Sequence, residues 1–206
     1  MIAAPAVALS VAPSRVVLVA SQAQTLTVTN RGAHATIVDV ARAGFALGLR
    51  GRARILARGA PLVVRPRRLA VAAHGTATLV VTSALPRGAG PGDHPGLVLL
   101  TTKPQRTAVG VRLRIGVVVL VRGPGRVLHR LIAQRLRVRG GRLELWVRNA
   151  GNVAEDCAGL QLRPALPVVP RTLLPGARAI CRLVRPAQRR GLLVVRVLSR
   201  TFRLRL

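Results

Sequence analysis

The sequence of 206 residues contains no tyrosine, two phenylalanines and one tryptophan. Basic side chains outnumber acidic ones 34 to 5, and every basic residue except Lys103 is an arginine. Proteins that bind single-stranded nucleic acid or read RNA stack the bases on several aromatic side chains. Three aromatic residues are too few for such a platform. This scarcity argues against specific nucleic-acid recognition.

Long hydrophobic runs are also missing. The longest, such as residues 116–121, are far shorter than the roughly 20 apolar residues of a membrane-spanning helix. This excludes a polytopic membrane protein. Half of the residues are nevertheless hydrophobic, with valine and leucine abundant. The chain can therefore bury a core, which excludes intrinsic disorder as its main state.

Few residues are placed to carry catalysis or to hold a metal. Glu155 and Asp156 are adjacent, but neighbouring side chains of an extended segment point to opposite faces, so they make a poor acid–base pair. The four histidines are widely spaced, and Cys157 and Cys181 lack the close pairing of zinc ligands. Nucleophile-elbow, phosphate-loop and HExxH motifs are absent from the sequence. We therefore expect no enzyme activity, no catalytic residues, no metal and no cofactor.

The net charge of +29 is spread along the chain, with +14 in residues 1–125 and +15 in residues 126–206. In residues 135–139 arginines alternate with apolar residues, which is typical of the solvated face of a strand. The charge predicts nonspecific attraction to polyanions, including anionic cell-wall polymers and acidic lipid surfaces. A coding bias that favours arginine over lysine is a simpler origin for much of it. The arginine clusters at 65–68 and 189–190 are expected to be solvated turns.

Hydrophobic residues recur with period two rather than 3.6, as in residues 76–82. Short alternating segments separated by turn sequences, at intervals of about 8–12 residues, predict antiparallel β-sandwiches. The expected strands are residues 7–11, 15–20, 24–30, 36–41, 54–57, 62–64, 76–82, 97–102, 107–121, 130–139, 142–149, 158–162, 168–173, 177–184, 192–198 and 201–206.

Gly123, Pro124 and Gly125 interrupt the longest expected strand, because these residue types do not continue a ladder. Residues 26–32 and 145–151 then echo each other, since each is an alternating strand that ends in Asn-x-Gly. The predicted fold class is all-β, with two immunoglobulin-like antiparallel β-sandwich domains in tandem. We expect the first domain at 1–122, a linker at 123–125 and the second domain at 126–206.

Cys157 and Cys181 both fall in the second expected domain. In an exported protein such a pair indicates an intradomain disulfide, whereas the alternative is two buried free thiols. Ala4 and Ala6 resemble the end of a signal-peptide cleavage site without the basic and apolar segments that precede one. We expect an exported protein whose recorded start lies downstream of the true start.

Several segments carry a resemblance to a known family. Residues 11–18, 26–32 and 91–102 resemble the N-terminal immunoglobulin-like domain of bacterial cell-surface proteins of the WxL-interacting type. Residues 149–152 and 174–176 resemble the second sandwich domain of the same family. This resemblance implies an exported, non-enzymatic protein whose first domain is associated with peptidoglycan and whose second domain binds a protein.

A second resemblance is to periplasmic pilus-assembly chaperones, which also have two immunoglobulin-like domains. Their first strand carries an arginine in a context similar to residues 14–17. This implies that Arg15 binds the C-terminal carboxylate of a subunit, a contact that suits a planar guanidinium. The strand expected at 107–121 would donate alternating apolar side chains to the subunit by strand addition. The donors would be Val109, Val111, Leu113 and Ile115, and the alternative is that these residues fill the domain's own core.

These observations predict a protein partner at the cell surface or an anionic cell-wall polymer, with no specific nucleic acid and no membrane span. The first hypothesis is a cell-surface or cell-wall-associated binding protein. The second is a chaperone-like protein that binds subunits by strand addition. The third is a nonspecific polyanion-binding protein.

Overall fold

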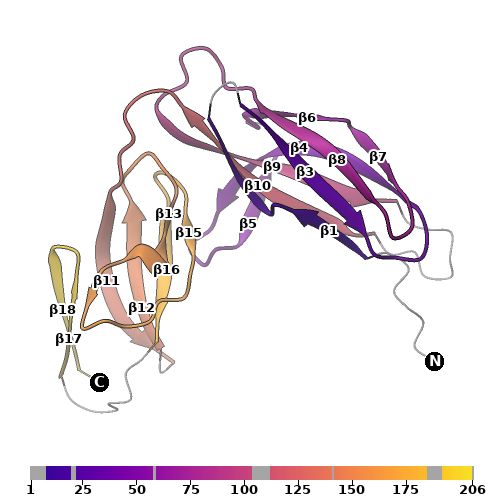
Figure 1. The fold of residues 1–206 in the computed structure, drawn as a ribbon. Helices are drawn as coiled ribbons and strands as arrows, with labels where there is room; N and C mark the ends of the chain where they lie inside the picture. Colours follow the sequence, from indigo (N-terminus) through magenta and orange to yellow (C-terminus); the bar gives the residue numbers. More distant parts are fainter. Residues whose placement is uncertain are drawn as a thin grey trace, which may run out of the picture. The chain divides into compact units, whose positions relative to one another are not determined.

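The structure is a computed structural model that describes residues 8–19, 22–57, 59–103, 112–140, 142–184 and 192–205. These residues form β-strands and a 3₁₀ turn at Cys157–Gly159, and the chain divides into two compact units (Figure 1). The predicted all-β fold class with two sandwich units is confirmed. Unit 1 comprises Met1–Phe45, Ile55–Gly90 and His94–Pro124, and unit 2 comprises Ala46–Arg54, Pro91–Asp93 and Gly125–Leu206.

Unit 2 therefore takes two short segments from the range 1–122, which the sequence assigned to the first domain as a whole. Hydrogen bonds tie both segments to the rest of unit 2. The backbone N–H of Ile180 donates to the carbonyl of Leu49 at 2.9 Å, and that of Asp93 donates to the carbonyl of Asn152 at 2.7 Å. Strands β4 and β9, which carry these segments, are longer than their alternating patterns predict.

Unit 1 is built from two sheets. One sheet has the order β1 (Leu9–Ala12), β3 (Ala23–Asn30), β8 (Thr76–Ser83), β6 (Leu62–Arg65). The other has the order β2 (Arg15–Val19), β10 (Arg114–Gly123), β9 (Gly92–Thr102), β4 (Thr36–Leu47), β5 (Ala53–Leu56), and β7 (Arg68–Val71) also pairs with β4.

Two features of unit 1 differ from the sequence prediction. Residues 68–71 form strand β7, although the arginines around Pro66 indicated a turn, because Leu69 and Val71 are buried against the core. One pair within the antiparallel sandwich is also parallel, since β2 runs parallel to β10. A parallel pair requires a long crossover, and most of unit 1 separates these two strands in sequence.

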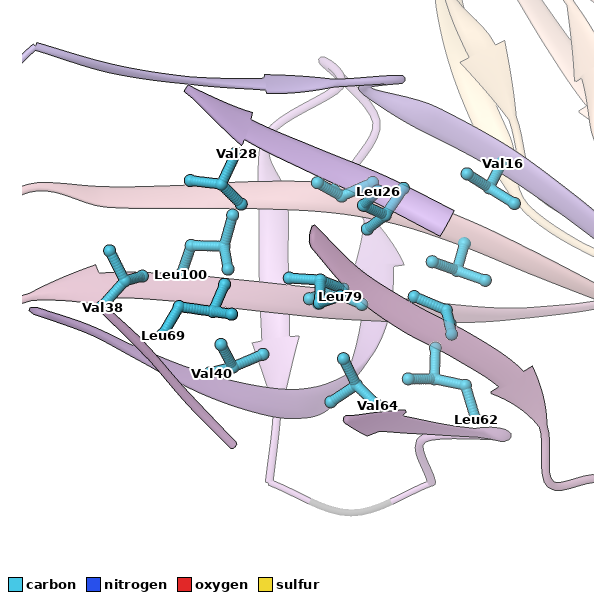
Figure 2. Close-up of a cluster of buried hydrophobic side chains, with 14 of the residues drawn as sticks. Val16, Leu26, Val28, Val38, Val40, Leu62, Val64, Leu69, Leu79 and Leu100 are labelled. Atoms are coloured by element: carbon cyan, nitrogen blue, oxygen red, sulfur yellow. The ribbon is translucent and has the colours of Figure 1, made fainter. Parts of the chain in front are cut away.

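The core of unit 1 lies between its two sheets. Leu26 and Val28 of β3 and Leu79 of β8 are at most 1 % exposed, and they face Val38 and Leu100 of the other sheet (Figure 2). Every second residue of these strands points inward, which is the period of two seen in the sequence. Each fully buried leucine or valine contributes roughly 1.5–3 kcal/mol, so this alternation is the main source of stability.

Unit 2 has three smaller sheets. One contains β11 (Leu131–Arg139), β12 (Arg142–Asn149) and β16 (Arg178–Leu183). A second contains β14 (Leu162–Arg163), β17 (Leu192–Val197) and β18 (Arg200–Arg205), and a two-stranded sheet pairs β13 (Glu155–Asp156) with β15 (Thr172–Leu173). The strand expected at 158–162 is largely absent from the described chain, because Cys157–Gly159 form the 3₁₀ turn. The strand expected at 168–173 is reduced to β15, and the nearby Pro164, Pro167 and Pro170 cannot donate to a ladder.

The echo between the two halves corresponds to one buried turn that both units contain. The side-chain amide of Asn149 donates to the carbonyls of Val153 at 2.7 Å and Leu173 at 3.0 Å, and its Oδ1 accepts from the N–H of Gly151 at 2.9 Å. Asn30 makes the same pattern in unit 1, with His34 and Ala72 as acceptors and Gly32 as donor. Both asparagines are at most 1 % exposed. Their side-chain amides therefore supply the hydrogen bonds that water would supply to these backbone groups at the surface.

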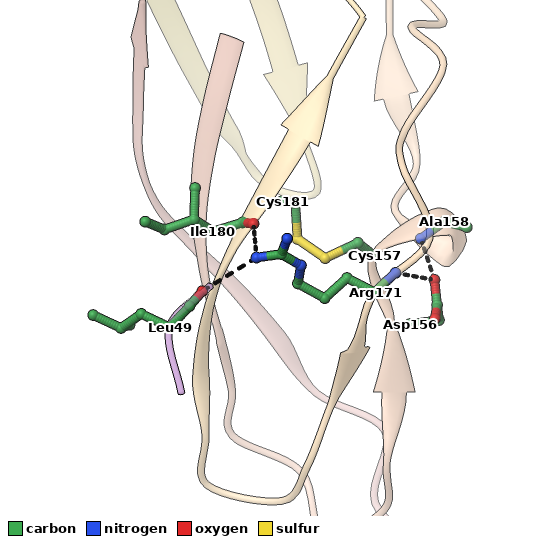
Figure 3. The surroundings of a disulfide bond; sticks show 7 residues. All are labelled: Leu49, Asp156, Cys157, Ala158, Arg171, Ile180 and Cys181. Atoms are coloured by element: carbon green, nitrogen blue, oxygen red, sulfur yellow. Dashed lines mark hydrogen bonds between the residues drawn. A yellow bond between two sulfur atoms is a disulfide. The ribbon is translucent and has the colours of Figure 1, made fainter. Parts of the chain in front are cut away.

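A disulfide joins the 3₁₀ turn of unit 2 to β16. Cys157 and Cys181 are fully buried, and their Cα atoms lie 5.7 Å apart (Figure 3). The guanidinium of Arg171 passes nearby and donates to the carbonyls of Ile180 at 3.0 Å and Leu49 at 3.4 Å. Burial lowers the pKa of Arg171 from its usual value, and the neighbouring Arg182 lowers it further. This side chain links the segment Ala46–Arg54 to β16.

Replacing Asn149 by alanine should lower the free energy of unfolding by about 2–4 kcal/mol, because two buried carbonyls lose their donor. Chemical denaturation monitored by circular dichroism measures the change. Gln24→Ala, a polar truncation at an exposed site, is the matched control and should change stability by less than about 0.5 kcal/mol. Equal stabilities of Asn149→Ala and the control would show that the buried turn is not a stabilising element.

Removing the disulfide by the double substitution Cys157→Ala and Cys181→Ala should cost about 3 kcal/mol, because the bond closes a loop with a sequence separation of 24. Urea denaturation of the variant and of the oxidised wild type gives the difference. The single variants leave one free thiol each and control for the loss of the side chains themselves. If the wild type unfolds at the same urea concentration with and without reductant, the disulfide does not stabilise unit 2.

Candidate functional site

The N-terminal segment of unit 1 crosses from one sheet to the other. Strand β1 pairs antiparallel with β3 up to Ala12, whereas β2 pairs parallel with β10 from Arg15 onward. Pro13 and Ser14 make the crossing, and Ser14 already accepts a hydrogen bond from the N–H of Val118 at 3.2 Å. The register of the parallel pair runs from Arg15 opposite Val118 to Val19 opposite Arg122.

This crossing leaves the beginning of β10 open on one side. The parallel register would place Ile115 level with Ala12, but Ala12 is paired with β3 in the other sheet. Within the described part of the chain, no strand pairs with β10 on this side before Val118. Because alternate residues direct their backbone groups to the same side, the N–H and C=O of Arg114 and Gly116 face the open side. We call this stretch, Arg114–Val117, the open edge of β10.

The other side of β10 is already occupied by β9. The N–H of Thr102 donates to the carbonyl of Leu113 at 3.0 Å, and the N–H of Leu113 donates to the hydroxyl of Thr102 at 3.0 Å. This pairing holds the start of β10 in an extended conformation. A strand that added to the open edge would therefore meet a backbone whose geometry is already fixed, as in β-augmentation.

The apolar side chains of β10 lose their cover toward the open edge. Val117 and Val119 face the core and are fully buried, whereas Ile115 and Leu113, on the same side of the strand, are only half-buried. Ile115 packs against the core of unit 1, which agrees with the alternative that these residues fill their own domain. Part of its surface remains uncovered all the same. The other two expected donors, Val109 and Val111, lie outside the described residues.

Arg15 lies at the first paired position of β2 and is exposed. It shares the outer face of the sheet with Val17 and Val19, which are 44 % and 48 % exposed. The structure thus brings Arg15 next to the open edge, but on the opposite face of the sheet from Ile115. The sequence interpretation did not identify Val17, Val19 or the backbone of Gly116. The only sequence feature that indicates exposed Val17 and Val19 is that residues 16–19 are apolar on both faces of the strand.

Other kinds of site find no support in the described residues. No group of three histidine, cysteine, aspartate or glutamate side chains there is close enough to hold a metal ion. The described chain also contains no helix of the length and hydrophobicity that a membrane span requires. Asp93 is buried and accepts a hydrogen bond from the N–H of Ala154 at 2.8 Å, which gives this carboxylate a structural role in unit 2.

No protein-family model and no curated protein matches the sequence. The fold, in contrast, is similar to solved structures over nearly its whole length. A chain of the complex of the Salmonella enterica SafA pilin with the SafB chaperone has a TM-score of 0.60 and 15 % identity, with 99 % of each chain covered. A chain of the Acinetobacter baumannii CsuC–CsuE chaperone–tip adhesion subunit complex has a TM-score of 0.58 and 13 % identity, with 96 % of this chain and 97 % of that chain covered.

The E. coli chaperone DraB is a further structure with this fold, with a TM-score of 0.55, 16 % identity, and 97 % and 99 % of the two chains covered. The fold is therefore that of the two-domain pilus chaperones. These likenesses support the second resemblance drawn from the sequence. They do not support the WxL-interacting resemblance, and they give no support to a cell-wall polymer as partner. They agree with the expectation of a non-enzymatic protein.

The open edge predicts a break in amide protection along β10. The N–H groups of Arg114 and Gly116 should exchange with solvent roughly 100-fold faster than those of Val118 and Leu120, which face β2. Hydrogen exchange measured by NMR resolves these residues individually. The N–H of Val117, which faces β9, is the internal control and should be protected. Equal protection of Gly116 and Val118 would show that the edge is already occupied.

Proposed function

We propose that this protein is a periplasmic chaperone-like protein that binds an extended segment of a partner protein subunit. The segment adds as a strand to the open edge of β10, and its terminal carboxylate binds Arg15. The observation that carries the proposal is the open edge itself, where backbone donors and acceptors of Arg114 and Gly116 face no strand among the described residues.

The side chains next to this edge support the proposal. A strand needs apolar contacts as well as backbone hydrogen bonds, and Leu113 and Ile115 offer half-buried apolar surface beside the edge. Exposed edges favour aggregation, and native proteins usually shield them. An open edge flanked by apolar side chains is therefore best explained as a place where another chain binds.

The likeness in fold supports the class of partner. One similar structure is described as a pilin in complex with its chaperone, and another as a chaperone–tip adhesion subunit pre-assembly complex. The buried disulfide between Cys157 and Cys181 suits an oxidising compartment such as the periplasm. At 13–16 % identity over the whole chain, the likeness is one of fold.

Arg15 has the properties that a carboxylate receptor needs. It is exposed, it sits where the open edge ends, and the planar guanidinium accepts a carboxylate bidentately. A strand that runs along Arg114–Val117 toward Val118 would bring its C-terminus to this position if it lies parallel to β10. The proposal therefore includes the direction of the bound strand.

The test uses an eight-residue peptide of alternating apolar residues, with either a free C-terminal carboxylate or a C-terminal amide. Isothermal titration calorimetry should show that amidation weakens binding to the wild type about tenfold or more, since charge-assisted hydrogen bonds contribute about 1.5–3 kcal/mol. For Arg15→Ala the acid and the amide should bind equally. Arg31→Ala, which removes an exposed arginine of a turn, is the matched control and should behave as the wild type.

The substitution Ile115→Asp tests the strand separately from the carboxylate. A charge at this half-buried position should reduce binding of both peptides at least about tenfold, because the added strand would have to desolvate it. Circular dichroism establishes that the variant is folded. If Ile115→Asp binds both peptides as the wild type does, the strand does not add at β10.

A further inference from the structure

Unit 2 presents an arginine-rich sheet face that the proposed strand-binding function does not use. In the sheet of β11, β12 and β16, Leu145 and Val147 point into the core, so the alternate residues point outward. The outward row of β12 consists of Arg142, Glu144, Trp146 and Arg148. The register of the two neighbouring strands then fixes which side chains lie beside each member of this row.

The register produces a two-dimensional array. Glu144 lies between Arg137 and Arg182, Trp146 lies between Arg135 and Ile180, and Arg148 lies between Ile132 and Arg178. Arg139 pairs with Arg142 at the end of the hairpin. We call this surface the arginine face. It consists of Arg135, Arg137, Arg148, Arg178 and Arg182 around Glu144 and Trp146.

The arginines of this face are accessible and make it strongly positive, whereas Ile180 beside Trp146 is buried. Four of its arginines are exposed and Arg182 is half-buried, whereas Glu144 is its one acidic residue. Arginines placed this close repel one another, and bound anions relieve this repulsion. Five of the 34 basic residues meet on one face of three strands.

The shape of the array indicates the kind of anion. Positions two apart on a strand are separated by about 6.6 Å and neighbouring strands by about 4.8 Å, so the charges are spread over two dimensions. A single polyanionic chain would use one row of such an array, whereas a layer of lipid headgroups presents phosphates in two dimensions. Trp146 is the one aromatic residue of this face, it is only partly exposed, and its nitrogen is buried without a hydrogen-bond partner among the described residues, so the face has no fully exposed aromatic ring for base stacking.

We propose that the arginine face docks unit 2 onto a membrane surface rich in anionic phospholipids. The guanidinium groups bind the headgroup phosphates, and no part of the unit crosses the bilayer. Arginine suits this role because its planar fork binds phosphate oxygens bidentately. Binding of this kind depends on the surface potential of the lipid and weakens as salt shortens the Debye length.

The test measures partition of the full chain onto vesicles of phosphatidylglycerol and phosphatidylcholine at 30:70, against vesicles of phosphatidylcholine alone. The variant carries Arg→Gln at 135, 137, 148 and 178. Each basic residue near an anionic surface contributes roughly fivefold to partition, so the four together should lower it at least about 100-fold. A matched control removes the same charge from the sheet of β14, β17 and β18, with Arg→Gln at 163, 196, 200 and 203, and should lower partition less than about tenfold.

The control separates a local surface from the net charge of the whole chain. Equal losses in the two quadruple variants would show that only net charge matters, and equal binding to the neutral vesicles would show that charge does not matter; either result overturns the proposal. If the first variant is unfolded by circular dichroism, the pairs Arg135/Arg137 and Arg148/Arg178 are tested separately, each with an expected loss of about 20-fold. Retained vesicle binding together with lost binding to duplex DNA would assign the face to nucleic acid and contradict the proposal.

Discussion

The crossing of the N-terminal segment between the two sheets of unit 1 determines how β10 is used. Residues up to Ala12 are paired with β3, so they are not available to β10, and the parallel pair can begin only at Arg15 and Val118. Strands β3 and β10 thus compete for the backbone of the N-terminal segment. Because β1 pairs with β3, the first residues of β10 have no strand beside them on that side. The same crossing places Arg15 at the end of that uncovered stretch. The open edge, the half-buried side chains beside it and the position of Arg15 therefore all depend on the pairing of β1 with β3.

The remainder of unit 1 keeps this edge in place. Strand β10 is paired with β9 on its other side, and its inward residues from Val117 onward are buried in the core. Unit 2 uses the same type of sandwich, with a buried asparagine turn equivalent to that of unit 1 and a disulfide in addition. The proposed functions of the two units differ because their exposed features differ. Unit 1 offers unpaired backbone and apolar surface, and unit 2 offers an array of guanidinium groups.

The alternation of apolar residues was sufficient to predict the all-β class and most strands, because a strand with one buried face has an apolar residue at every second position. The strand at 68–71 and the loss of strands around Pro164, Pro167 and Pro170 were not predicted. Both depend on which backbone groups form hydrogen bonds with a neighbouring strand, and the local sequence pattern does not specify this. The same limit applies to the candidate site. Arg15, Leu113 and Ile115 were named from a resemblance, but the open edge is a property of tertiary pairing. The arginine face likewise needs the register of three strands, which residues 135–139 alone do not specify.

The central claim is that a partner strand pairs with the open edge of β10. The most direct measurement is an NMR structure of the full chain bound to the alternating peptide, with intermolecular contacts between backbone protons. We expect contacts from the peptide backbone to Arg114 and Gly116, in parallel register and with the peptide C-terminus beside Arg15. Contacts along another exposed edge, such as that of β6, with none to Gly116, would contradict the account.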